Sequence, residues 1–175
     1  MPGFAAVAQP WHDLFMLAGQ ASATLVGLMF VAASVGSGLF TQERRPAFRI
    51  FVSSSVVSFS CVLAACLVTM MPAPGWLAGG LLVGADGLFG FGYGALVAIN
   101  MWRHRFGAAV TWDDRLLYAL VPVCTHLGIL TAAVLLLAQV AVGVEVLAVS
   151  ISVLLLVGIR NAWDITAWSV MARRQ

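Results

Sequence analysis

The sequence of 175 residues contains no lysine, and only 9% of its residues are charged. A water-soluble domain carries about 25% charged residues, so this shortage excludes an ordinary soluble fold. No long polar segment interrupts the apolar runs, and hydrophobic residues make up 62% of the chain. We therefore expect a single membrane domain over residues 1–175, surrounded by the lipid bilayer. The net charge of only +2 argues against nucleic acid as a partner.

The sequence is also poor in the residues that build catalytic and metal sites. Its three cysteines, Cys61, Cys66 and Cys124, all lie in apolar runs, which is typical of reduced, buried thiols. No serine is paired with a base, and no group of residues has metal-ligand spacing. We therefore expect no enzyme, no cofactor and no metal. The first ten residues contain no basic side chain, so we expect no cleavable signal peptide.

What the chain does contain is a series of long apolar runs. They predict an all-α integral membrane bundle of about five transmembrane helices, because each run is long enough to cross a bilayer as a helix. The expected spans are 13–40, 50–70, 76–101, 116–140 and 145–168. Pro122 lies inside the fourth span. It should kink that helix and leave a carbonyl one turn earlier without its donor.

The basic residues predict the orientation of these spans. With five spans, all of them fall on one side of the membrane, in the first and third loops and near the C-terminus. They are Arg44, Arg45, Arg49, Arg103, Arg105, Arg115, Arg160, Arg173 and Arg174. The positive-inside rule then predicts an outside N-terminus and a cytoplasmic C-terminus. Four or six spans would divide this set between the two sides.

Two ionisable side chains are predicted to lie near the middle of the bilayer. Asp86 follows Trp76 by ten residues and His126 follows Leu116 by ten, which is about 15 Å of helix in each case. The hydrocarbon core is about 30 Å thick. Gln20 and Thr24 should reach a similar depth in the first span. The sequence therefore predicts a polar layer of Asp86, His126, Gln20 and Thr24.

This layer has two interpretations. A carboxylate inside a membrane costs on the order of 2.5–3.5 kcal/mol, and such residues often mark proton or ion paths. The first interpretation is therefore a small, oligomeric ion or proton channel or transporter that uses Asp86 and His126. In the second, both groups are neutral and hydrogen-bonded and only hold helices together. The protein would then be a non-transporting structural or accessory subunit.

Small residues recur at helical spacing in two of the spans. The first span has such residues at every fourth position, and the third span has a glycine-rich run. They are Gly19, Ala23 and Gly27 in the first span, and Gly80, Gly84, Gly87, Gly90 and Gly94 in the third. Small residues let helices in membranes approach closely. We expect these stripes to pack helices, either within the chain, in self-association, or against another membrane protein.

The end of the last span carries two opposite charges. Arg160 and Asp164 are four residues apart, so they share a helix face and should form an ion pair.

Two stretches carry a resemblance. One is Trp11-His12-Asp13-Leu14-Phe15, leading to Gly19-Gln20-Ala21-Ser22-Ala23-Thr24-Leu25-Val26-Gly27-Leu28-Met29-Phe30-Val31-Ala32. The other is Gly158-Ile159-Arg160-Asn161-Ala162-Trp163-Asp164. Together they resemble small, uncharacterised multi-pass membrane proteins of bacteria. The resemblance covers the first span and the end of the last. It implies a bacterial inner membrane and says nothing about a substrate.

Overall fold

The computed structural model describes residues 3–36, 45–72, 75–103 and 116–172. These residues form helices and contain no strand, as the sequence predicts. The chain begins with α1 (Phe4–Ala8) and a 3₁₀ turn, η1 (Gln9–Trp11), and then forms α2 (His12–Gly36). Next come α3 (Arg45–Met70) and α4 (Trp76–Arg103). A π-helical turn, η2 (Leu116–Leu120), leads into α6 (Val121–Leu137), and α7 (Val142–Ala172) ends the described chain.

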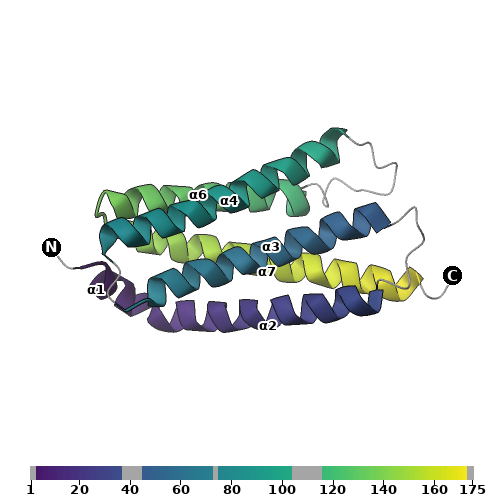
Figure 1. Cartoon of the computed structure of the whole chain (residues 1–175), viewed down its shortest axis with the longest axis horizontal. Helices are drawn as coiled ribbons and strands as arrows, with labels where there is room; N and C mark the ends of the chain where they lie inside the picture. Colours follow the sequence, from purple (N-terminus) through teal and green to yellow (C-terminus); the bar gives the residue numbers. More distant parts are fainter. Residues whose placement is uncertain (1–2, 37–44, 73–74, 104–115, 173–175) are drawn as a thin grey trace.

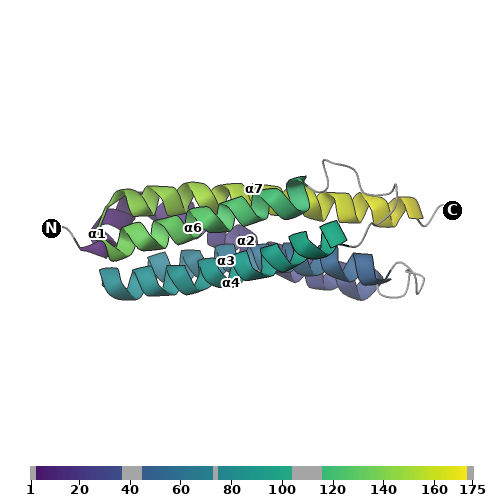
Figure 2. The same cartoon turned by 90° about the horizontal axis from the view of Figure 1, so that it is seen from above.

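The helices run up and down along one long axis, with the two termini at opposite ends (Figure 1). In this view α4 and α6 lie above α3 and α7, and α2 lies along the lower edge. Figure 2 shows α6 beside α7 on one side and α3 beside α4 on the other. Within the described residues five segments run along the bundle, namely α2, α3, α4, η2 with α6, and α7.

These helices are those of an integral membrane protein. Four of the described helices are long and apolar enough to cross a membrane, and Val121–Leu137 is a shorter apolar helix. The observed bounds differ from the expected spans by a few residues. α3 begins at Arg45 rather than near residue 50, and α7 begins at Val142 rather than at 145. Residues 37–40 of the first expected span lie outside the described residues.

The N-terminal residues form part of the packed bundle. The ring of Phe4 is buried and meets the ring of Trp76 edge to face, with centroids 5.7 Å apart. Its other neighbour is Gly79, where a Cβ would lie 3.3 Å from the Phe4 ring. Pro10 lies in the 3₁₀ turn that joins α1 to α2, because it fixes φ without needing a donor. Thus α1 closes one end of the bundle over the start of α4.

The fourth crossing does not bend in the way that the sequence predicts. Pro122 lies in the first turn of α6, and the break takes the form of the π-helical turn Leu116–Leu120 before it. A π turn widens the helix by one residue. The interruption therefore precedes the proline, and the remainder of α6 continues regularly to Leu137.

The glycines of α4 bring this helix close to α6. The contacts run antiparallel down the interface, from Gly80 beside Leu137, through Gly84 beside Ala133 and Gly87 beside Ile129, to Gly90 beside His126 and Gly94 beside Val123. A Cβ on Gly80 would lie 2.7 Å from the Leu137 side chain, closer than real side chains approach. The glycine run of the sequence therefore forms one continuous packing face.

The turn between α6 and α7 closes with an unusual residue. Gln139 has φ 59°, in the left-handed region that glycine normally occupies at a helix end. Its N–H donates to the Leu136 carbonyl over 2.9 Å, and the N–H of Val140 donates to the Leu135 carbonyl over 2.9 Å. This is the pair of hydrogen bonds of a Schellman motif. It lets α7 turn back directly along α6.

Candidate functional site

Asp86 lies in the part of α4 that faces the interior between α3 and α4. Its carboxyl accepts a hydrogen bond from the thiol of Cys61 in α3, and Cys66 of α3 lies close enough to interact with its charge. The second carboxyl oxygen, Oδ2, is buried and has no hydrogen-bond partner in the described part of the chain. A buried polar atom without a partner costs about 1–3 kcal/mol. Asp86 is therefore held by one helix and has one free acceptor.

His126 is anchored by the proline of its own helix. Its side chain is 2% exposed, and Nδ1 lies 2.7 Å from the Pro122 carbonyl oxygen. Because a carbonyl only accepts, Nδ1 carries the hydrogen, and the neutral ring then has its lone pair on Nε2. Nε2 is buried and lacks a hydrogen-bond partner among the described residues. The imidazole therefore presents an unused acceptor to the bundle interior.

Gly90 fixes the spatial relation between these two groups. The His126 ring lies directly against Gly90, so that a Cβ at this position would overlap the ring. Gly90 follows Asp86 by four residues, which is one helical turn on the same side of α4. Since both Asp86 Oδ2 and His126 Nε2 lack partners, the two side chains are not hydrogen-bonded to each other. They lie about one turn apart along α4, roughly 6 Å of rise.

Gln20 and Thr24, the other two residues of the predicted polar layer, do not face this interior within a single copy of the chain. Both side chains are exposed on the outer side of α2. The Thr24 hydroxyl donates to the Gln20 backbone carbonyl over 2.9 Å, which satisfies the hydroxyl within its own helix. The reason is rotational, because the face of α2 that packs inward contains Phe15, Ala18, Ser22 and Met29.

Ser22 is the polar residue of α2 that the sequence interpretation missed. It is 0% exposed, and its Oγ has no hydrogen-bond partner in the regions described. Its level in the bundle follows from Gly19, whose Cβ position lies 3.2 Å from Cys66. Because α2 and α3 are antiparallel, Ser22 lies one turn further along, at the level of Leu63. Buried serines in membrane helices normally bond to their own backbone, so the free hydroxyl of Ser22 is unusual.

The small residues of α2 fall on two different faces. Gly19 packs against Cys66, as a close-packing stripe requires. Ala23 and Gly27, in contrast, are exposed, and within the described parts of the chain no atom lies within 4 Å of a Cβ built on Gly27. Of the stripe Gly19, Ala23 and Gly27, only Gly19 therefore packs α2 against another described helix.

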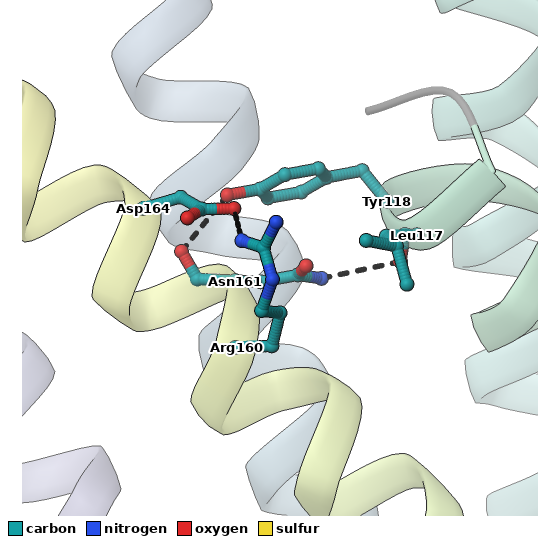
Figure 3. A network of polar contacts seen from close by, with 5 residues as sticks. All are labelled: Leu117, Tyr118, Arg160, Asn161 and Asp164. Carbon is teal, nitrogen blue, oxygen red and sulfur yellow. Dashed lines mark hydrogen bonds and ion pairs between the residues drawn. The ribbon is translucent and has the colours of Figure 1, made fainter. Parts of the chain in front are cut away.

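A second polar cluster lies between η2 and α7 (Figure 3). Arg160 and Asp164 form an ion pair within α7, and both side chains are partly exposed. Beside them Asn161 is 3% exposed. The hydroxyl of Tyr118 donates to the Asn161 backbone carbonyl over 2.8 Å, and Asn161 Nδ2 donates to the Leu117 carbonyl over 3.3 Å. Residue spacing does not predict this connection, because it joins segments more than 40 residues apart.

Proline explains why the Leu117 carbonyl needs an outside donor. In a π turn the carbonyl of residue i accepts from the N–H of residue i+5. For Leu117 that residue is Pro122, which has no N–H. The side chain of Asn161 replaces the missing donor and so ties the π turn to α7.

This arrangement can exchange protons, but it is poor in ligands for a metal. Within the described residues no three His, Cys, Asp or Glu side chains gather closely enough to hold an ion. Asp86 and His126 can each bind or release a proton, because each has an acceptor atom without a hydrogen-bond partner among the described residues. Comparisons with protein-family models, with curated proteins and with solved structures find no match to this chain.

Proposed function

We propose that this membrane protein moves protons through its helical bundle, with Asp86 as the central proton-binding group. The observation that carries the proposal is the buried, unpartnered Oδ2 of Asp86. An ionisable side chain inside a membrane is by default a functional candidate. The thiol of Cys61 holds the carboxyl in place, while the free oxygen remains available to a proton or to water.

In this proposal His126 is the second proton-binding group. Its Nε2 is an unused acceptor, and its ring lies against Gly90, one turn from Asp86. A separation of about one helical turn is too long for a direct hydrogen bond, but one water molecule can bridge it. Protons would pass between Asp86 and His126 through such a water, and the chemistry requires no metal or cofactor.

Flux into liposomes that contain the purified full-length protein tests this function. Wild type and Asp86→Asn are compared across a pH series with a pH-sensitive dye inside the vesicles. Asp86→Asn keeps the shape but cannot lose a proton, so it should abolish the flux. The matched control is Glu145→Gln, which neutralises an exposed carboxylate in the first turn of α7 and should leave the flux unchanged.

The second candidate function is a structural or accessory membrane subunit. It is favoured by the close packing of α4 on α6, where a Cβ on Gly80, Gly87 or Gly90 would collide with the facing side chain. In that case the Asp86–Cys61 contact only joins two helices. Absence of flux in wild-type protein that is folded would exclude the proton-moving function and leave this one.

We also propose that the protein lies in a bacterial inner membrane with its N-terminus outside. The described helix ends support this orientation, because Arg45 begins α3 and Arg103 ends α4 at the same end of the bundle as the C-terminus (Figure 1). Arginine-rich ends remain on the cytoplasmic side.

A further inference from the structure

We propose that α2 is a self-association face, at which Gln20 of one copy pairs with Gln20 of a second copy of this chain. The inference is independent of the proposed proton-moving function. It begins from the position of Gln20, which lies eight residues, about 12 Å, after the start of α2 at His12. The side chain is therefore well inside the membrane.

At this depth the Gln20 carboxamide faces lipid in a single copy of the protein. The side chain is exposed, and α2 lies along the outer edge of the bundle, where it packs on α3 and α7 (Figure 1). Its side-chain amide has no hydrogen bond to any described residue, since only its backbone carbonyl is engaged, by Thr24. Hydrocarbon provides no donor or acceptor, so a lone carboxamide there is costly.

A second copy of this chain meets that requirement better than an unrelated partner. A carboxamide contains both donors and an acceptor, so two such groups related by a two-fold axis satisfy each other. Copies of a membrane protein share one orientation, so a two-fold axis along the membrane normal places the two Gln20 side chains at the same depth. An axis that passes beside Gln20 on the exposed face of α2 then brings the two carboxamides together.

The residues around Gln20 allow the two helices to approach closely. Ala23, Thr24 and Gly27 lie within about 60° of Gln20 on the helix surface, and all three are exposed. A Cβ added to Gly27 would meet no described atom within 4 Å, although glycine weakens a helix relative to alanine. A small residue is useful here if another backbone packs on it. Thr24 does not compete for the carboxamide, because its hydroxyl is bound to its own helix.

The test measures association of the full-length protein in lipid bilayers. Donor- and acceptor-labelled copies are mixed, and energy transfer is followed as the protein is diluted with lipid. We expect Gln20→Leu to weaken association by about tenfold, and Gln20→Asn, which keeps the carboxamide, to retain it. Thr131→Val is the polar control, because Thr131 is exposed on α6 and is likewise bound to its own helix.

A glycine pair provides the steric control. Gly27→Leu should abolish association, whereas Gly92→Leu on α4 should not, since Gly92 is equally exposed and has no described atom within 4 Å. Helicity and thermal unfolding of each variant show that it is folded. Wild-type protein that is monomeric at all dilutions would overturn the proposal. So would a folded Gln20→Leu variant that associates as tightly as wild type, because another surface would then be responsible.

Discussion

The side chain of Asn161 donates a hydrogen bond to the carbonyl of Leu117, which lies 44 residues earlier in the chain. The acceptor is the carbonyl that Pro122 leaves without its π-turn donor. A hydrogen bond that is missing within one helix is thus replaced by a hydrogen bond from a polar side chain of another helix. The contribution of the Asn161 amide to the free energy of unfolding should therefore depend on residue 122 being proline.

The first prediction is therefore a coupling between Asn161 and Pro122. Asn161→Ala should lower the free energy of unfolding by about 1–3 kcal/mol, since it leaves the partly buried Leu117 carbonyl unpaired. In a Pro122→Ala background residue 122 regains an N–H, and the cost of Asn161→Ala should fall by at least about 0.5 kcal/mol. Unfolding in mixed micelles gives the free energy of unfolding of wild type, the two single variants and the double variant, which together form the double-mutant cycle. Asn100→Ala, on an exposed position of α4, is the control.

Independent effects of the two substitutions would contradict this account. The Tyr118 hydroxyl bonds to the backbone of Asn161, so it survives the substitution and does not confuse the result.

The second prediction concerns the contact between Gly90 and His126. Gly90→Ala puts a methyl group where the imidazole lies, and overpacking of this kind costs about 1–3 kcal/mol. The cost should be smaller in a His126→Ala background, where the ring is absent. Gly92→Ala, with open space around it, should be neutral or stabilising by up to about 1 kcal/mol. Equal effects at positions 90 and 92, measured by thermal unfolding, would refute the contact.

The fold could be predicted from the sequence because its signals are local. Long apolar runs, short polar links and the turn near residue 140 predict an all-helical bundle, and the glycine run of α4 predicts a close helix contact. The faces of α2 could not be predicted in the same way. Lipid-facing and buried positions are equally apolar in a membrane protein, so periodicity does not separate Gln20, which is exposed, from Ser22, which is buried.

The polar contacts between helices could not be predicted from the sequence either. Pro122 indicates that a carbonyl needs a donor, but the choice of Asn161 depends on how α6 and α7 are rotated and shifted relative to each other. Likewise, Asp86 and His126 could be placed at similar depth by counting residues. Only the position of Gly90 under the His126 ring shows how the two groups are related.

The third prediction concerns orientation. All nine basic residues are arginines, and with five spans the sequence predicts that they lie on one side of the membrane. In a bacterial host, a green fluorescent protein fused to the C-terminus should fluoresce, and an alkaline phosphatase fused there should be inactive, because the proposed orientation puts the arginine-rich end in the cytoplasm. The same pair of reporters fused after Ala138, in the α6–α7 turn, serves as the opposite-side control. Phosphatase activity at the C-terminus would overturn the orientation.

The fourth prediction concerns the turn between α6 and α7. Gln139 adopts a left-handed conformation, φ 59°, which costs a non-glycine residue about 1 kcal/mol or more. Gln139→Gly should relieve this cost, partly offset by the greater flexibility of the unfolded chain, for a net gain of about 0.5–1 kcal/mol. Gln139→Val should be destabilising, because a β-branched side chain tolerates this region poorly. Thermal unfolding of the three proteins gives the order. If glycine proved less stable than glutamine, the side chain of Gln139 would have to contribute a contact that outweighs the backbone strain.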